Sequence, residues 1–257
     1  MRAIRVATGA AVALVAAAAG ASWAQGGGFG TIQSAPVPPG HAFYFTRGIY
    51  TGFGGRRFGS WATDWPKADR QFLIGLTRLT KVDAYDGDNA VRLDDPELRR
   101  FPLLYMVEVG RMDLTEPEVL GLRGYLEAGG MLFVDDFWGA AQWANFEANI
   151  RRVLPEYPIV ELAPEHPVRR GVYTIDTIVQ VPNIGNGCRG GPTGEYGGNV
   201  PYLLGMSDDR GRLLVLISYN SDLGDAWEWA EQPCYPLPFS NYAYRLGVNA
   251  VVYGMTH

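Results

Sequence analysis

Two acidic segments follow apolar stretches that are typical of buried strands. Asp135 and Asp136 come directly after residues 131–134 (MLFV), and a second segment at 220–228 (NSDLGDAWE) follows residues 213–219 (LLVLISY). In open α/β sheets, ligands bind beyond the carboxyl ends of the strands. Carboxylates placed there can bind a cation, accept hydrogen bonds from sugar hydroxyls or act as a base. We therefore expect both segments to line one site.

The second segment carries four carboxylate or carboxamide side chains within nine residues: Asn220, Asp222, Asp225 and Glu228. Hard cations such as Ca²⁺ or Mg²⁺ take oxygen ligands, so the three acids are candidate metal ligands and Asn220 and Asp222 are candidate ligand contacts. The spacing does not match an EF-hand, whose loop is longer and carries glycine at its sixth position. The alternative is that these side chains cap helices and bind loop amides.

The two consecutive aspartates at 135–136 have an equivalent alternative. Neighbouring strand residues point to opposite faces of a sheet. One aspartate can therefore cap the next helix while the other faces a cleft, or both can be structural caps. Asp135 and Asp136 are candidate catalytic residues.

Arg47 and Tyr50 follow the first predicted strand and are candidate ligand contacts, with a glycine-rich stretch at 50–59 after them. That stretch carries neither a P-loop nor a dinucleotide-binding fingerprint before the next helix. A tight surface loop is therefore expected there. Arg47 either binds an anion or forms a structural ion pair with a nearby carboxylate.

His166 and Trp227 are the remaining candidates. His166 titrates near neutral pH, so it is a candidate proton carrier beside the acids, or else a hydrogen-bonded structural residue. Trp227, with Trp229, either forms a platform on which a sugar stacks or seals the core.

Strands and helices alternate along the chain. Thr115 and Glu118 form a capping-box pattern before a helical repeat, which ends at Gly129 and Gly130. The chain pattern predicts strands at 42–46, 81–84, 102–109, 131–134, 159–162 and 213–219, and helices from Pro66, at 115–128, 140–153 and 240–253. Such alternation predicts an α/β fold with a mostly parallel sheet, helices on both faces and loop insertions.

The first 24 residues have the form of a cleavable secretion signal. Arg2 and Arg5 precede an apolar run at 6–20, and Ser22-Trp23-Ala24 fits a cleavage site. We expect a signal peptide at 1–24, a flexible lead-in at 25–40, and one α/β domain at 41–257. The protein would then be periplasmic or secreted, without membrane insertion after cleavage.

Charge and cysteine content narrow the function classes. The 257 residues carry a formal net charge of −5, and loss of the two leader arginines leaves −7. An acidic domain is a poor partner for nucleic acid. Cys188 and Cys234 either pair in an oxidising compartment or remain free thiols. Because G-x-S-x-G, H-E-x-x-H and C-x-x-C motifs are missing, a serine hydrolase, a zincin and a thioredoxin-like protein are disfavoured.

Several segments together resemble family 4159 of the bacterial domains of unknown function, over residues 41–257. They read FYFTRGIY, WPKAD, FPLLYMVEVG, LRGYLEAGGMLFVDD, EHPV, SYNSDLGDAWE and AYRLGVNAVVYGMTH. The helix–Gly-Gly–strand unit is more distantly similar to class I glutamine amidotransferase-like proteins, which implies a flavodoxin-like sheet. In those enzymes a nucleophilic cysteine sits on the turn that holds Asp135 and Asp136 here. The resemblance thus implies the fold without glutaminase chemistry.

The sequence is consistent with two functions. The first is a non-catalytic or regulatory module of the cell envelope that binds a small polar ligand, a glycan or a protein partner. The second is a hydrolase of a glycan or other polar envelope substrate that uses these carboxylates, with or without a divalent cation. Convergence of the acids with His166 beside them favours the hydrolase, and acids bonded to backbone amides or arginines favour the binding module.

Overall fold

The computed structural model describes residues 37–53 and 60–257. The predicted signal peptide, the predicted lead-in up to residue 36, and residues 54–59 of the glycine-rich stretch lie outside the described residues. Within the described ranges, none of the helices combines the length and apolar composition needed to cross a membrane.

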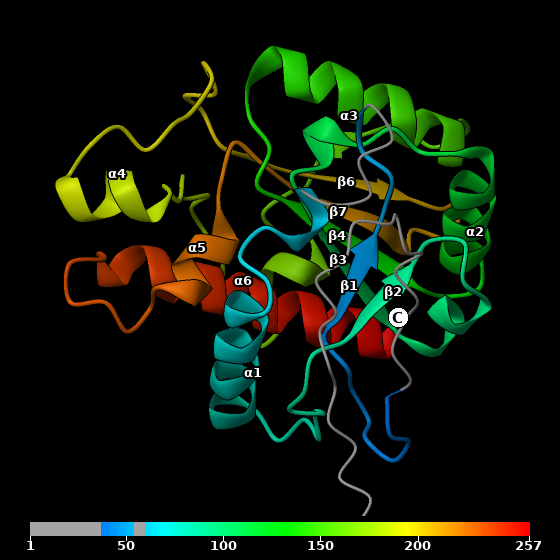
Figure 1. The fold of residues 1–257 in the computed structure, drawn as a ribbon, viewed down its shortest axis with the longest axis horizontal. Helices are drawn as coiled ribbons and strands as arrows, with labels where there is room; N and C mark the ends of the chain where they lie inside the picture. The colour runs from blue at the N-terminus through cyan, green and yellow to red at the C-terminus, as the bar shows by residue number, and fades with distance from the viewer. Residues whose placement is uncertain (1–36, 54–59) are drawn as a thin grey trace, which may run out of the picture. The chain divides into compact units, whose positions relative to one another are not determined.

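A seven-stranded sheet forms the centre of the described region (Figure 1). Five neighbouring strands, β2, β1, β3, β4 and β7, are mutually parallel. The other two are antiparallel to their neighbours, β6 to β7 and β5 to β6. The predicted mostly parallel sheet is therefore confirmed. In spatial order the strands are β2 (Ala90–Arg92), β1 (Thr46–Ile49), β3 (Leu103–Val107), β4 (Met131–Asp135), β7 (Leu213–Tyr219), β6 (Tyr202–Ser207) and β5 (Val160–Glu161).

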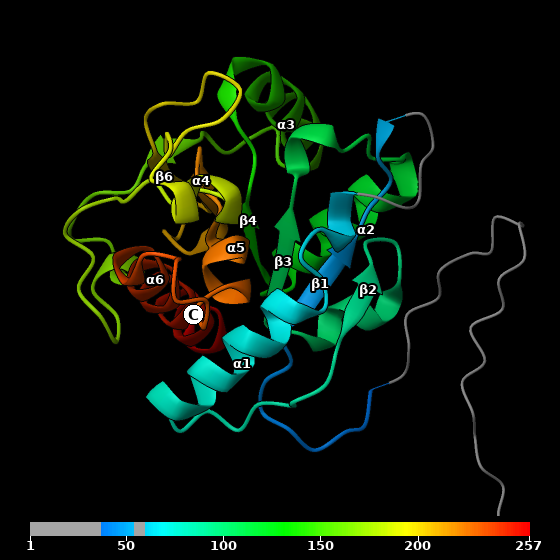
Figure 2. The ribbon, with the colours of Figure 1, turned by 60° about the vertical axis from the view of Figure 1, so that its left-hand side comes forward.

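Helices cover both faces of this sheet, as predicted (Figure 2). One face carries α1 (Lys67–Leu79), α5 (Leu223–Glu228) and α6 (Leu237–Thr256), and the other carries α2 (Glu116–Glu127) and α3 (Gly139–Val153). The connection from β5 to β6 contains α4 (Ile184–Arg189). Short 3₁₀ turns are η2 (Ser60–Ala62), η3 (Pro96–Arg100), η4 (Val109–Arg111) and η5 (Pro167–Arg169).

The β3–α2–β4 unit follows its local sequence signals closely. Glu118 Oε2 accepts a hydrogen bond from the backbone N–H of Thr115 at 2.8 Å, so one orphan donor at the helix start is satisfied. The helix ends where Gly129 adopts a φ of 113° and Gly130 N–H donates to the Tyr125 carbonyl at 3.1 Å. The chain then enters β4, whose last residue is Asp135.

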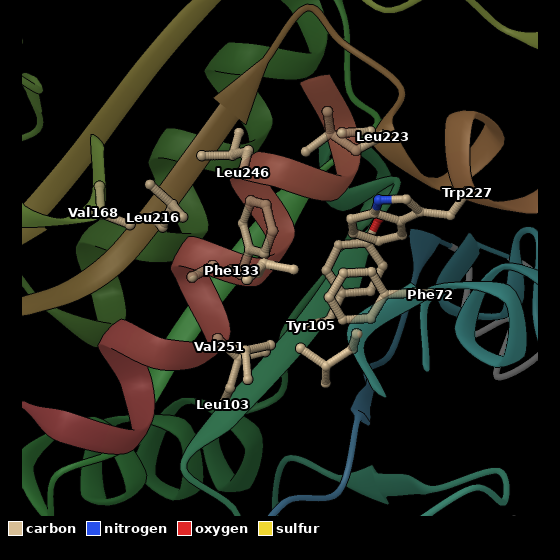
Figure 3. Packing of buried hydrophobic residues seen from close by; sticks show 14 of the residues in the cluster. Phe72, Leu103, Tyr105, Phe133, Val168, Leu216, Leu223, Trp227, Leu246 and Val251 are labelled. Atoms are coloured by element: carbon tan, nitrogen blue, oxygen red, sulfur yellow. The ribbon is translucent and has the colours of Figure 1, made fainter. Parts of the chain in front are cut away.

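Alternate residues of the central strands pack beneath α1, α5 and α6 (Figure 3). Trp227 of α5 is fully buried, and its ring lies 4.6 Å from that of Phe72 and 5.3 Å from that of Tyr105, measured between centroids. Large buried aromatic rings contribute strongly to packing. Because Trp227 anchors α5 to the sheet, the acids on the same short helix are held at a fixed place.

Some predicted boundaries differ from the observed ones. The first strand begins at Thr46 rather than near residue 42, and residues 81–84 form only an isolated bridge between Ala84 and Phe43. The edge strand β2 at Ala90–Arg92 was not predicted. With three residues and one buried side chain, β2 carries too short a pattern to be recognised.

Candidate functional site

Three adjacent strands end in a polar residue with left-handed backbone geometry. Glu108 follows β3 with φ 53°, Asp136 follows β4 with φ 52°, and Asn220 follows β7 with φ 58°. Non-glycine residues adopt this region rarely, and Asn and Asp do so most readily. The turns are cross-linked, since Glu108 N–H donates to the Asp136 carbonyl and Asp136 N–H to the Ser221 carbonyl, both at 3.1 Å. This arrangement draws the three chain segments together at the carboxyl edge of the sheet.

Two groups of carboxylates meet at this edge and share one member. The first group is Asp64, Asp136 and Asp222; the second is Asp64, Asp225 and Glu228. Within each group, one oxygen of every residue lies within 4.8 Å of the others. Oxygens on opposite sides of a Ca²⁺ ion are separated by about 4.8 Å, at a ligand distance of about 2.4 Å. The donor sets and spacing are therefore those that a hard cation takes.

Asp64, which precedes the helix predicted from Pro66, was not among the predicted site residues. In the structure Pro66 occupies the N-cap position of α1, without a side-chain cap. Asp64 instead has a φ of 61° and directs its carboxylate toward α5. A Cβ at Gly224 would lie 2.6 Å from Asp64 Oδ2, so this approach requires glycine there. Asp64 stands directly before Trp65 and Pro66. Apart from the tendency of aspartate to adopt left-handed geometry, nothing in this stretch of sequence indicated that its carboxylate would reach the other acids.

Arg47 lies in the core and holds the segment that carries Asp64. Its side chain is fully buried, with Nη2 donating to Asp69 Oδ1 at 2.7 Å and Nη1 donating to the Thr63 carbonyl at 2.8 Å. Of the two roles considered for Arg47, the structural ion pair is the observed one. Its role in the site is indirect, through the backbone just before Asp64.

Asp135 lies beside the cluster but acts as a structural acceptor. Its Oδ2 accepts hydrogen bonds from the backbone N–H groups of Leu223 at 2.7 Å and Gly224 at 3.2 Å, and from the Tyr105 hydroxyl at 2.9 Å. The consecutive aspartates thus divide their roles: Asp135 binds the first turn of α5, and Asp136 joins the first carboxylate group.

Asp222 and Asp225 combine capping with membership of the carboxylate groups. Asp222 Oδ1 accepts from the Asp225 N–H at 2.8 Å, and Asp225 Oδ2 accepts from the Ile184 N–H at 2.6 Å. Glu228 Oε1 lies 3.7 Å from Lys67 Nζ. The two alternatives weighed for this segment, caps and converging acids, are both observed.

Burial and neighbouring negative charges raise the pKa values of these acids. Burial, followed by the negative charge of Asp225, raises the pKa of Asp64 to about 8. Burial also raises the pKa of Asp136 well above its usual range, with Glu108 adding to it, and does the same for Asp222, with Asp136 adding to it. A cation bound among these groups would favour their ionised forms.

A family model described as Domain of unknown function (DUF4159) matches residues 50–255. The chain belongs to this family. A search of the curated proteins found no match. The DUF4159 match includes every member of both carboxylate groups, from Asp64 to Glu228, whereas Arg47 lies before it.

Tyr50, Asn220 and Trp227 of this DUF4159 chain, for which ligand contacts were predicted, make structural contacts. The buried Tyr50 hydroxyl donates to the Val107 carbonyl at 2.8 Å. Asn220 Oδ1 accepts from the Gly139 N–H at 2.9 Å, and its Nδ2 donates to the Val200 carbonyl at 2.7 Å. Trp227 is fully buried, so the core role is the observed one and a sugar cannot stack on it.

His166 lies away from the carboxylates, which corrects its expected position beside them. Its ring centroid is 5.9 Å from that of Tyr253, whose hydroxyl accepts from the N–H of Leu213, the first residue of β7. The acids follow the other end of that strand, which is roughly 20 Å long for seven residues. Burial, followed by the neighbouring His257, lowers the pKa of His166. His166 therefore lies apart from both carboxylate groups.

A disulfide joins Cys188 and Cys234, with their Cα atoms 4.8 Å apart. The paired form is therefore the one observed of the two considered. Cys188 lies in the last turn of α4 and Cys234 lies in the connection between α5 and α6, so the bond links two segments that flank the second carboxylate group.

Proposed function

We propose that the protein is an exported, non-catalytic or regulatory module of the cell envelope that binds a polar ligand, a glycan or a protein partner through a divalent cation. The observation that carries this proposal is the position of Asp64. Its Oδ2 is buried and has no hydrogen-bond partner among the described residues, and Asp64 belongs to both carboxylate groups. A buried polar atom without a partner suggests an ion or water at that place.

The charge balance supports a cation there. Asp64, Asp136, Asp222, Asp225 and Glu228 all have raised pKa values, and burial is the largest cause for each. Without a cation, these groups reduce their repulsion by keeping protons. Ca²⁺ or Mg²⁺ would displace those protons, so binding should release protons and strengthen with rising pH.

Asp64 would hold the cation with either Asp136 and Asp222 or Asp225 and Glu228. Ca²⁺ takes six to eight oxygen ligands and Mg²⁺ takes six. Three monodentate carboxylates leave positions for water or for oxygens of a bound molecule. Hydroxyl, carbonyl and carboxylate oxygens are the groups that a glycan or a polar peptide offers, which is why we assign a polar ligand to this site.

We further propose that the fold is class I glutamine amidotransferase-like. The support is the strand–helix–Gly-Gly–strand unit and the sharp turn after β4, where Asp136 has a φ of 52°. In such enzymes the turn carries a nucleophilic cysteine. Here it carries an acid, and the two cysteines of the chain are joined to each other elsewhere. This difference favours a binding or regulatory role over glutaminase chemistry.

A hydrolase is the second candidate, and the sharing of Asp64 by both groups favours it. Two-metal hydrolytic sites hold their ions about 3.5–4 Å apart, where one carboxylate can contact both ions. In that case the carboxylates would position a water for attack on a glycan or another polar substrate, and no histidine of the described region lies within either group.

Titration of Ca²⁺ and Mg²⁺ into the chelator-treated protein tests cation binding. A native-state ligand at about 100 times its Kd stabilises by about 2.7 kcal/mol, which thermal unfolding detects. We expect the wild type to be stabilised and Asp64→Asn to lose the response. Asp209→Asn, an exposed acid outside both groups, is the matched control and should respond as the wild type does. A wild type that neither cation stabilises at millimolar concentration contradicts the proposal.

Activity assays separate the two candidates. The cation-loaded protein is tested for release of p-nitrophenol from p-nitrophenyl esters, phosphates and glycosides. Turnover that requires the cation and disappears in Asp136→Asn would make the hydrolase the better candidate. Cation binding without turnover on these probes is the result expected for the binding module.

A further inference from the structure

The α4 segment, residues 181–191, is bonded directly to two members of the carboxylate groups. The Ile184 N–H donates to Asp225 Oδ2 at 2.6 Å, and the Asp222 N–H donates to the Val181 carbonyl at 3.0 Å. The first bond and the Trp229 indole N–H, which donates to Asp225 Oδ1 at 3.1 Å, together orient the Asp225 carboxylate and support its negative charge. The position of α4 therefore affects how the second carboxylate group is presented.

Two contacts with the connection after α5 hold the α4 segment in place. Cys188 is bonded to Cys234, and the Tyr235 hydroxyl donates to the Pro182 carbonyl at 2.7 Å. Gly187 lies against the Tyr235 ring, where an added Cβ would come within 2.6 Å of a ring carbon. Ile184, the donor to Asp225, lies in α4 with Cys188. Asp225 lies in α5, and Cys234 follows α5 in the chain. The disulfide therefore ties together the two segments that this hydrogen bond connects.

This disulfide has one of its two residues at the surface. Cys234 is exposed and Cys188 is partly buried. Exposed disulfides are the ones that external thiols reduce most readily, and they include regulatory bonds. The chain contains just these two cysteines, so reduction cannot lead to an alternative pairing within it.

We propose that the Cys188–Cys234 disulfide is a redox latch on the carboxylate site: the oxidised protein holds the Ile184 amide on Asp225 and binds the cation, and reduction weakens that binding. This inference rests on the proposed cation site. It adds a regulator of defined chemistry, a dithiol protein or small dithiol that exchanges with Cys234.

The exchange is balanced in atoms and electrons. A thiolate of the dithiol attacks Sγ of Cys234, the Cys188–Cys234 bond breaks, and Cys188 leaves as a thiolate that takes up a proton. The second thiolate of the reductant then attacks the reductant sulfur that is bonded to Cys234. Cys234 leaves as a thiolate and is protonated. Two electrons pass to the protein, and the dithiol becomes a disulfide.

Reduction should loosen the α4 segment without unfolding the domain. The Tyr235–Pro182 hydrogen bond and the packing of Gly187 remain, but the covalent constraint is gone. Loss of a hydrogen bond that orients a metal ligand lowers metal affinity by about 10–100-fold. We therefore expect Ca²⁺ to bind at least about tenfold more weakly to the reduced protein.

Calorimetric titration of Ca²⁺ into the oxidised protein, and into protein reduced with dithiothreitol and kept anaerobic, tests the latch. The Cys188→Ser/Cys234→Ser variant should bind as weakly as the reduced wild type and should not respond to dithiothreitol. Hydrogen exchange at the Ile184 amide gives a readout independent of the cation, and this amide should exchange faster after reduction. Circular dichroism checks that each form remains folded.

The outcomes are distinct. Equal or tighter Ca²⁺ binding by the reduced protein overturns the latch, as does unchanged protection of the Ile184 amide. An oxidised protein that binds neither Ca²⁺ nor, in the same titration, Mg²⁺ overturns the cation site itself, and the latch as its regulator, even when the Ile184 amide responds to reduction. Weaker binding together with faster exchange supports both proposals.

Discussion

Asp64 reaches the other acids because two local conditions are met at once. Its own backbone is left-handed, with φ 61°, and the facing residue on α5 is Gly224, which leaves room for the carboxylate. The two carboxylate groups thus depend on Gly224, which has no side chain.

Replacement of Gly224 by alanine tests this dependence. The added Cβ would lie 2.6 Å from Asp64 Oδ2, so we expect about 1–3 kcal/mol of destabilisation from overpacking and a reduced cation response. Gly254→Ala is the matched control, because Gly254 is also helical and the nearest atom to an added Cβ is 3.4 Å away. Chemical denaturation should show Gly254→Ala to be neutral or slightly stabilised. Equal effects of the two substitutions would contradict the close approach.

The raised pKa values predict a pH dependence of stability. Asp64 has a pKa of about 8 in the folded protein against 3.8 as its ordinary value, and that of Asp135 is raised to about 7, chiefly by burial. The folded state therefore binds more protons than the unfolded state between about pH 4 and pH 8. Unfolding free energy should fall as pH rises through this window in the presence of chelator.

Thermal unfolding from pH 5 to pH 8.5 measures this effect. Asp64→Asn should remove part of the slope, on the order of 1–3 kcal/mol across the window, and saturating Ca²⁺ should remove it in the wild type. A stability that rises with pH over the same range would mean that these acids are ionised and well compensated in the folded protein.

At the level of elements, one buried ion pair connects β1, the residues before Asp64, and α1. Arg47 in β1 binds Asp69 in α1 and the carbonyl of Thr63. Both side chains are almost fully buried, so loss of one partner leaves an uncompensated charge in the core. The pair therefore matters through its geometry: it fixes the connection that carries Asp64 against the sheet.

Arg47→Met should destabilise the protein by about 3–5 kcal/mol, measured by urea unfolding. Arg100→Met is the control, because Arg100 pairs with Glu97 at the surface and such pairs contribute about 0–1 kcal/mol. A small effect at Arg47 would mean that Asp69 is protonated in the folded protein. The double substitution Arg47→Met/Asp69→Leu should recover part of the loss.

Elements with a strong local pattern could be predicted from the sequence. Strand β7 was predicted with its observed bounds, and α2 with its capping residues, because apolar periodicity and caps act over a few neighbouring residues. Strand β6 and the short helices α4 and α5 were not predicted. They depend on distant partners: β6 on pairing with β7, α4 on the disulfide, and α5 on the buried ring of Trp227.

At the scale of the whole molecule, the site was partly predictable. Asp136 and Asp222 follow parallel neighbouring strands, so their convergence follows from sheet topology. Asp64 comes from the connection after β1, and nothing local to it indicates that this connection reaches α5. His166 was misplaced because the chain after β5 turns back along α6 instead of continuing to the carboxyl edge.

The disulfide also affects global stability. Its cysteines are 46 residues apart in the sequence and enclose β6, β7 and α5. In the chain-entropy description, a cross-link of this span contributes about 4 kcal/mol by restricting the unfolded chain. Guanidinium unfolding should show that the free energy of unfolding of Cys188→Ser/Cys234→Ser is lower by this amount than that of the oxidised wild type. Both proteins are measured without reductant. A loss below about 1 kcal/mol would contradict this description.

The left-handed ends of β3, β4 and β7 affect how substitutions at the site should be interpreted. Alanine at Asp136 or Asn220 would remove a side chain and also the short polar group that eases left-handed geometry, which costs other residues roughly 1–2 kcal/mol. An alanine scan would thus attribute backbone strain to lost chemistry. Glycine tolerates the same backbone angles, so comparing glycine with alanine at each position separates what the side chain does from what the turn requires.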